Sequence, residues 1–286
     1  MALKQTAAAA ITPELRQWIG EQTRAGHGPQ VLLESMKTSG WQEDTALDAL
    51  EIVLGEMLES QKTQAITALA VPEPPVAGSP SRIWAHDREV GIVMAMRSPR
   101  VIVFSGLLSD EECDELVALS RERLARSHTV DTATGDSEVN EARTSDGMFF
   151  TRGENELVTR FETRLAALCG WPLENGEGLQ ILHYRPGAEY KPHYDYFDPA
   201  KPGTPVILRR GGQRVATIVT YLNTPEAGGG TTFPDVDLEI AAVKGNAVFF
   251  SYDRPDPATR SLHGGAPVVA GEKWVATKWL RSGRFD

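Results

Sequence analysis

Apolar side chains recur at helical spacing through the first sixty residues, interrupted by glycines at Gly26, Gly28 and Gly40. Thr12 is a suitable N-cap, and Pro13 suits the first position of a helix. The pattern predicts three short helices that share one small core. The residues at helical spacing are Leu15, Trp18, Ile19 and Gln22, then Val31, Leu32, Ser35 and Met36, and then Ala46, Leu47, Leu50, Val53, Leu54 and Met57.

These helices define a predicted small domain over residues 1–70. The segment loosely resembles three-helix modules of the ubiquitin-associated type, which would make it a candidate for binding a protein partner. A helical appendage packed on the main domain explains the pattern equally well. Residues 71–85 follow, and their prolines lack amide donors and stiffen the chain. We expect a semi-rigid linker there; a proline-motif ligand is the alternative.

From residue 86 to residue 286 the pattern changes to short apolar runs separated by Gly/Pro turns. Two helices are expected, one capped by Ser109 with Glu112 completing a capping box, and one from about Glu154 to Cys169. Many short strands with such turns predict a mainly β fold with flanking helices (α+β), in the form of a double-stranded β-helix, or jelly roll. The expected strands are Gly91–Met96, Arg100–Phe104, Leu179–Tyr184, Val215–Leu222, Ala247–Ser251 and Trp274–Trp279. The polar stretch 127–147 is long enough to be a lid.

Composition narrows the class of partner and compartment. The chain has 286 residues and a formal net charge of −10, which argues against a nucleic-acid partner because phosphate binding needs a basic surface. No apolar run approaches the roughly 20 residues of a membrane span. The first residues form a weak imitation of a signal peptide that we interpret as a frayed terminus. Both cysteines, Cys113 and Cys169, fall in predicted helices, which favours a reduced, cytoplasmic protein.

One constellation carries candidate chemistry. His193 and Asp195 are two residues apart, so an extended backbone would direct both to one side, and His263 could complete the set from a distant strand. Two imidazoles and one carboxylate suit Fe(II) with open coordination positions. A three-ligand zinc hydrolase is a weaker alternative, since no glutamate base is identifiable nearby. Lys273 lies between apolar runs, which favours an inward side chain that meets a carboxylate.

The remaining histidines have no such context. We interpret His27, His86, His128 and His183 as surface or packing residues, although His183 is close enough in sequence to support the metal ligands.

Several motifs, in order, resemble the prolyl 4-hydroxylase family of Fe(II)/2-oxoglutarate dioxygenases over roughly residues 90–284. The resemblance implies iron held by His193, Asp195 and His263. It implies 2-oxoglutarate bound through Tyr184, Thr231 and Lys273, dioxygen as the oxidant and ascorbate as an accessory reductant. The motifs are Leu-Gln-Ile-Leu-His-Tyr-Arg-Pro-Gly-Ala-Glu-Tyr-Lys-Pro-His-Tyr-Asp-Tyr-Phe (179–197), Gln-Arg-Val-Ala-Thr-Ile-Val-Thr-Tyr-Leu-Asn (213–223), Gly-Gly-Gly-Thr-Thr-Phe-Pro (228–234), Ser-Leu-His-Gly-Gly-Ala-Pro-Val (261–268) and Gly-Glu-Lys-Trp-Val-Ala-Thr-Lys-Trp-Leu (271–280).

The same resemblance implies hydroxylation of an unactivated C–H bond, C4 of a prolyl residue in a peptide or protein, with 2-oxoglutarate converted to succinate and carbon dioxide. Asp195 favours hydroxylation, because related halogenases carry a small residue at that position. The positions matching the family's substrate groove are Arg143, Ser145, Glu177, Tyr190, Arg214 and Trp279. Structural roles are equally open for these six: Arg214 would pair with a carboxylate, and Trp279 would belong to the core. A free amino acid as substrate, or a sensor that binds the oxo-acid without turnover, are the alternatives.

Overall fold

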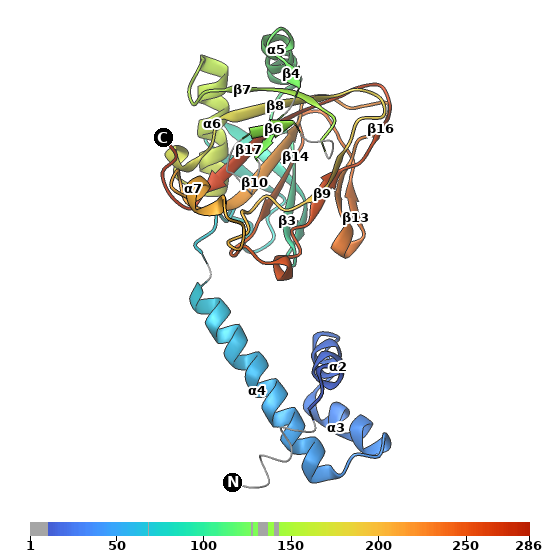
Figure 1. Ribbon diagram of the computed structural model, residues 1–286. Helices are drawn as coiled ribbons and strands as arrows, with labels where there is room; N and C mark the ends of the chain where they lie inside the picture. Colours follow the sequence, from blue (N-terminus) through green and yellow to red (C-terminus); the bar gives the residue numbers. More distant parts are fainter. Residues whose placement is uncertain (1–10, 68, 127, 131–136, 140–142) are drawn as a thin grey trace. The chain divides into compact units, whose positions relative to one another are not determined.

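The computed structural model describes residues 11–67, 69–126, 128–130, 137–139 and 143–286 (Figure 1). The chain divides into two compact units, Met1–Ala68 and Leu69–Asp286. Each has its own hydrophobic core, and the candidate site residues all lie in the larger one.

The smaller unit consists of helices α2 (Pro13–Arg24), α3 (Pro29–Thr38) and α4 (Glu43–Thr67). Thr12 caps α2, since its hydroxyl accepts a hydrogen bond from the amide of Leu15 at 3.3 Å. The third helix has 25 residues and is longer than the short helix expected. Its sequence contains no proline, and the single interior Gly55 costs only about 1 kcal/mol of helix stability. The buried residues Ile11, Ile19, Leu32, Met36, Ala46, Ala49, Leu50 and Val53 form its core.

The larger unit is built on a nine-stranded antiparallel sheet with the strand order β1-β2-β3-β14-β10-β17-β8-β7-β4. Alternate side chains of each strand face opposite sides. One face therefore packs under helices and the other lines an interior. The strands are β1 (Arg82–Ala85), β2 (Arg88–Met96), β3 (Arg100–Ser105), β4 (Ala125–Arg126), β7 (Asp146–Phe150), β8 (Leu179–Tyr184), β10 (Arg214–Tyr221), β14 (Ala247–Ser251) and β17 (Lys273–Arg281).

A second sheet of four strands, in the order β13-β12-β15-β9, packs against the inner face of the first. Phe233 from β12 and Ile240 from β13 share one core with Tyr221, Val248 and Val275 of the large sheet. Two antiparallel sheets around one interior form the jelly roll, so the predicted fold class is confirmed. The strands of the smaller sheet are β9 (Tyr190–His193), β12 (Thr231–Phe233), β13 (Leu238–Ile240) and β15 (His263–Gly265).

Two further pairs of short strands complete the topology: β5 (His128–Val130) with β6 (Ser137–Val139), and β11 (Ala227–Gly228) with β16 (Val268–Ala270). The expected lid over residues 127–147 falls in part outside the described residues. Its last residues begin strand β7.

Helices α5 (Asp110–Arg121) and α6 (Glu156–Cys169) contribute to the core on the outer face of the large sheet. Ser109 and Glu112 form the predicted capping box at the start of α5. The buried guanidinium of Arg164 in α6 pairs with Asp87 at 2.8 Å and with Glu112 at 2.9 Å. This ion network connects the two helices to the β1–β2 turn. The short helix α7 (Thr204–Leu208) was not predicted, because five residues carry too little periodicity.

The segment expected to be a linker differs from the prediction. Val76 packs against the core of the larger unit, and the Glu73 carboxylate binds Arg100. Residues 82–85 form the edge strand β1, in which Ile83 is buried and Trp84 exposed. The prolines therefore lie on the larger unit, and the alternating pattern after them should have indicated a half-buried strand.

The two cysteines are unpaired and buried. Burial raises the pKa of the Cys113 thiol to about 12, so the thiol stays protonated and inert at neutral pH. Among the described residues, no helix combines the length and hydropathy that a bilayer crossing requires.

Candidate metal centre and ligand pocket

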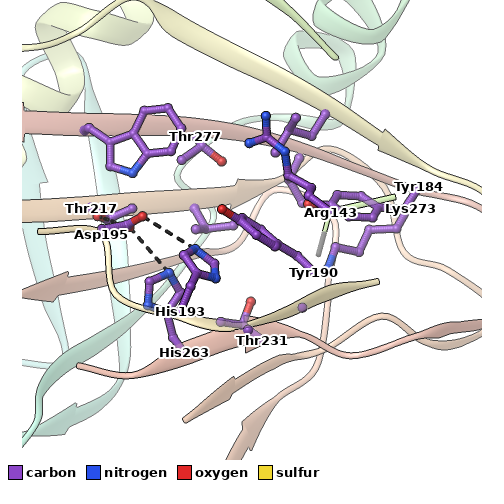
Figure 2. Close-up of a pocket in the computed structure, with 16 residues that line it drawn as sticks. Arg143, Tyr184, Tyr190, His193, Asp195, Thr217, Thr231, His263, Lys273 and Thr277 are labelled. Carbon is purple, nitrogen blue, oxygen red and sulfur yellow. Dashed lines mark hydrogen bonds and ion pairs between the residues drawn. The ribbon is translucent and has the colours of Figure 1, made fainter. Parts of the chain in front are cut away.

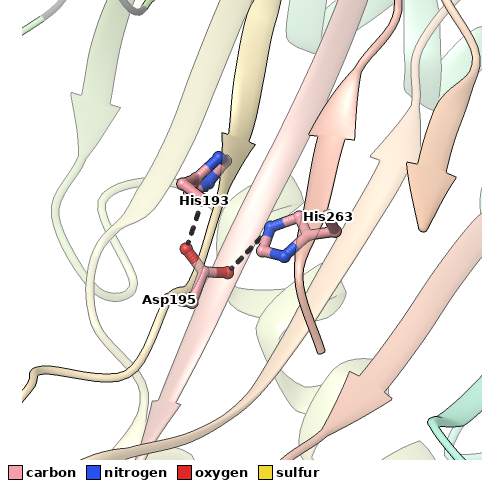
Figure 3. Close-up of side chains that lie close together, drawn as sticks. All are labelled: His193, Asp195 and His263. Atoms are coloured by element: carbon pink, nitrogen blue, oxygen red, sulfur yellow. Dashed lines mark ion pairs between the residues drawn. The ribbon is translucent and has the colours of Figure 1, made fainter. Parts of the chain in front are cut away.

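His193, Asp195 and His263 meet at one end of the small sheet (Figure 3). His193 ends β9 and His263 begins β15, and the two are direct partners in the antiparallel register. Asp195 follows β9 by two residues. One ligand atom from each side chain lies within 4.8 Å of the others. The Nε2 atoms of His193 and His263 lie 3.6 Å and 3.4 Å from the two oxygens of the Asp195 carboxylate.

Backbone carbonyls orient both imidazoles. Nδ1 of His193 lies 2.9 Å from the Lys191 carbonyl, and Nδ1 of His263 lies 2.9 Å from the Ser261 carbonyl. A carbonyl only accepts, so each Nδ1 carries the proton and each Nε2 presents its lone pair toward Asp195. Tyr190 stacks on the His193 ring at a centroid distance of 3.7 Å and restricts its rotation.

The protonation states suit a divalent cation. Burial opposes ionisation of Asp195, but His263 and His193 outweigh it and hold the pKa of the carboxyl well below its usual range. Burial, followed by the neighbouring His263, lowers the pKa of His193. The site thus offers a neutral imidazole at His193 and an ionised carboxylate at Asp195, which are ligand forms that metals bind.

Two hydroxyl groups extend from the carboxylate into the core. The Thr217 hydroxyl lies 2.6 Å from Oδ2 of Asp195 and 2.9 Å from the hydroxyl of Tyr252. The carboxylate can only accept, so Thr217 donates to Asp195, and Tyr252 in turn donates to Thr217. Burial raises the pKa of Tyr252 well above its usual value, which keeps this donor protonated. These two hydrogen bonds hold Oδ2, while Oδ1 lies 3.6 Å from Nε2 of His193 and 4.0 Å from the Arg214 guanidinium.

A pocket leads from the metal ligands between the two sheets to Lys273 (Figure 2). The Lys273 side chain is buried, and no carboxylate of the described residues pairs with it. Burial lowers the pKa of its amine to about 8. Its Nζ lies 4.9 Å from the ring centroid of Tyr184. A buried amine without an ionic partner is costly, so the pocket is suited to a ligand that brings a negative charge.

Thr231 and Tyr184 both line this pocket. The hydroxyl of Thr231 lies 2.6 Å from that of Tyr221, so it is held in place. Burial raises the pKa of the Tyr184 hydroxyl, while Arg143 and Ser145 act in the opposite direction. The structure therefore brings all three residues expected to bind the oxo-acid to one pocket.

Of the six residues expected to bind substrate, Arg143, Tyr190 and Trp279 line the pocket. The Arg143 guanidinium lies 5.3 Å from the Tyr190 ring centroid and donates to the Gln180 side chain at 3.4 Å. Trp279 is 7% exposed, and its indole N–H has no hydrogen-bond partner among the described residues.

The other three, Ser145, Glu177 and Arg214, lie outside the lining of the pocket. Glu177 accepts from Arg214 Nε at 2.7 Å and from Arg281 Nε at 2.6 Å. The Arg214 guanidinium in turn stacks 3.9 Å from the Trp279 ring centroid. The interpretation of Arg214 as a partner of a carboxylate matches this geometry, and the Glu177–Arg214 pair supports the Trp279 wall from behind.

The sequence interpretation missed several lining residues. Val275 and Thr277 share the face of β17 that carries Lys273, and the two-residue period of a strand would have indicated them. Leu182, Thr217 and Val219 come from β8 and β10, and only the strand pairing shows that they face the same space.

His183, by contrast, lies away from the metal ligands: it stacks on Trp274 at 4.3 Å, and its Nε2 lies 2.8 Å from Glu272.

Comparison with known proteins gives a consistent set of relatives. Residues 179–281 match the family model described as the 2OG-Fe(II) oxygenase superfamily. Prolyl 4-hydroxylase 2 of Arabidopsis thaliana is 41% identical over 213 residues, which cover 66% of this chain and 69% of the relative. Probable prolyl 4-hydroxylase 7 of the same plant is 42% identical over 210 residues, which cover 66% and 65%. The crystal structure of a viral collagen prolyl hydroxylase from Paramecium Bursaria Chlorella virus-1, a 2OG complex, is 30% identical with a TM-score of 0.49 and covers 63% of this chain and 94% of that chain.

Proposed function

Because this chain belongs to the prolyl 4-hydroxylase family of 2-oxoglutarate- and iron(II)-dependent dioxygenases, we propose that it hydroxylates C4 of a prolyl residue within a peptide or protein. Fe(II) and 2-oxoglutarate are its cofactor and cosubstrate. When bound, they supply the oxidising power, with 2-oxoglutarate converted to succinate and carbon dioxide.

The observation that carries the proposal is that one pocket holds three metal-ligating side chains and a buried lysine that pairs with no carboxylate of the described residues. His193, Asp195 and His263 would hold the iron on one side and leave the other side open. Lys273 would bind the far carboxylate of 2-oxoglutarate, helped by the hydroxyls of Tyr184 and Thr231. The pocket lies between these two groups, as a ligand that is chelated at one end and anionic at the other requires.

The walls of the pocket would exclude water and position the prolyl ring. Leu182, Val219 and Val275 give the interior an apolar surface, which protects reactive species from solvent. Tyr190 and Trp279 line the pocket, and a pyrrolidine ring packs well against aromatic side chains. Arg143 over Tyr190 would orient a peptide carbonyl.

The decisive experiment offers a library of proline-containing peptides to protein loaded with Fe(II) and 2-oxoglutarate. We expect one added oxygen atom in the peptide, measured by mass, and one succinate for each. His193→Ala and Asp195→Ala should abolish both products, and His27→Ala, which changes a histidine of the smaller unit, should abolish neither. Wild-type protein that binds 2-oxoglutarate but forms no succinate with any peptide would instead support the sensor.

We propose three further points about this protein. Ascorbate would sustain repeated turnover, and the yield of product with and without ascorbate tests this. The two unpaired, buried cysteines suit a reducing compartment such as the cytoplasm, and imaging of the tagged protein tests this.

The smaller helical unit would bind a protein partner, and its exposed Val31 and Leu47 are apolar side chains that such a partner could cover.

A further inference from the structure

Phe149 is a large aromatic side chain that faces solvent beside the pocket. It is 50% exposed, whereas its neighbours Met148 and Phe150 on β7 are buried in the core that α6 covers. Alternation along a strand therefore turns Phe149 to the opposite face, which is the face that carries the pocket. A single exposed apolar side chain is ordinary on a protein surface, so the case for a ligand depends on what surrounds Phe149.

The strand register connects Phe149 to the pocket without a break. Phe149 is opposite Gln180 on β8, Gln180 is opposite Thr277 on β17, and Thr277 is opposite Val219 on β10. Thr277 and Val219 line the pocket, and Gln180 is buried with Arg143 bound to its amide. These four positions form one row across adjacent strands that Figure 1 labels side by side.

A hollow lies at the outer end of this row. Phe149, Gly178 and Phe285 line it, together with Glu177 and Arg210. A Cβ on Gly178 would stand only 3.7 Å from the Phe149 ring and 2.8 Å from the Phe150 carbonyl. A residue with a side chain at position 178 would therefore crowd the hollow beside Phe149. The same Glu177 pairs with Arg214, which stacks on Trp279 at the pocket wall. Glu177 of the hollow is thus connected to the Trp279 wall of the pocket through Arg214, although no residue lines both.

We propose that this hollow binds a second segment of the peptide whose prolyl residue enters the pocket. The inference rests on the proposed function. Phe149 stands three strands from Val219, which is about 14 Å at the usual strand spacing. Thr217, the partner of Asp195, lies two residues further along β10, so the diagonal from Phe149 to Thr217 is about 16 Å. A proline-rich peptide in the polyproline II form advances ~3.1 Å per residue. The peptide residue at Phe149 is therefore about five positions from the target proline, and a proline there would stack on the aromatic ring.

The test compares two peptides, one with two residues on each side of the target proline and one extended by six proline-rich residues on both sides. Wild-type protein should show the higher kcat/KM for the long peptide. In Phe149→Ala the ratio of long to short should fall about fivefold to tenfold, the loss expected for one aromatic contact. Phe149→Trp should retain the ratio. Trp84→Ala removes a more exposed aromatic side chain from β1, at the other end of the sheet, and should leave the ratio unchanged.

A binding measurement separates this inference from the proposed function. The fluorescently labelled long peptide is titrated with metal-free protein, so that no turnover occurs, and its anisotropy gives Kd. A weaker Kd in Phe149→Ala than in Trp84→Ala supports the hollow even if no peptide is hydroxylated. Equal Kd values, an unchanged kcat/KM ratio, or a peptide that fails to bind the wild type would each overturn it.

Discussion

At the scale of single residues, the site depends on groups that only the folded chain brings together. The histidines and Asp195 could be identified from their spacing and context, but Thr217 and Tyr252 could not. Thr217 lies in a strand of mostly apolar residues, and Tyr252 lies just after another strand. These two residues support the site through two hydrogen bonds, one from Thr217 to Asp195 and one between Tyr252 and Thr217.

Thr217→Val should weaken metal binding, because it removes the donor that fixes Oδ2 of Asp195 and leaves that oxygen buried without its hydrogen bond. We expect Kd for Mn(II), a redox-stable substitute for iron, to rise by about tenfold to a hundredfold, as is typical when a supporting partner of a metal ligand is lost. Titration of metal-free protein, followed by the electron paramagnetic resonance signal of free Mn(II), measures this.

Two variants serve as controls for that prediction. Thr217→Ser keeps the hydroxyl and should keep the affinity, and Tyr252→Phe removes only the outer donor and should have a smaller effect. If Thr217→Val binds Mn(II) as tightly as the wild type, the hydroxyl does not position the carboxylate.

The role proposed for Lys273 predicts a pH dependence of cosubstrate binding. Its amine has a pKa lowered to about 8 by burial, and only the charged form attracts the far carboxylate of 2-oxoglutarate. Affinity should therefore be full below pH 7 and fall as the pH rises through 8. The charged fraction falls about tenfold between pH 7 and pH 9, so Kd should rise by about the same factor. Calorimetric titration with Mn(II) present checks this; Lys273→Met should bind weakly at every pH, and a slope retained in that variant would contradict the assignment.

At the scale of elements, helices α5 and α6 and the β1–β2 turn share the buried Arg164. Arg164→Leu would leave the Glu112 carboxylate largely buried with its main partner gone. Burial opposes the ionisation of Glu112, yet hydrogen bonds from Arg164 and from the Ser109 amide hold its pKa at about 2. We expect the free energy of unfolding to fall by about 3–5 kcal/mol, the usual cost of breaking a buried pair. Urea denaturation measures the change.

Arg123→Leu is the matched control for that variant. It breaks a partly exposed pair with Glu154 and should cost less than about 1 kcal/mol. The Arg164 network also predicts how the stability of the fold changes in acid. The pKa of Glu112 is lower in the folded state than in the unfolded state. Its contribution to stability is therefore present above about pH 4.5 and lost as the pH falls toward 2. Equal losses in the two arginine variants would contradict a structural role for Arg164.

At the scale of the whole molecule, the jelly roll was predictable because its strands repeat a simple pattern between Gly/Pro turns. The helix caps at Ser109 and Thr12 were also readable, since a cap depends on three or four adjacent residues. The edge strand Arg82–Ala85 was missed because the prolines before it dominate the local composition. The Glu177–Arg214–Trp279 wall was not derivable, since register between strands is set by the fold.

The division into two units supports a prediction for the truncated protein. Residues 69–286 contain two hydrophobic clusters of their own, and the buried core of residues 11–57 is separate from both. A protein that starts at Leu69 should therefore unfold in a single cooperative transition with an unchanged midpoint for the jelly roll, and it should keep its affinity for 2-oxoglutarate with Mn(II). Circular dichroism during thermal unfolding, together with calorimetric titration, checks both. If the truncated protein loses cooperative unfolding, the helices complete the catalytic unit. If it folds normally but no longer binds a large protein substrate, the helices act in partner recognition.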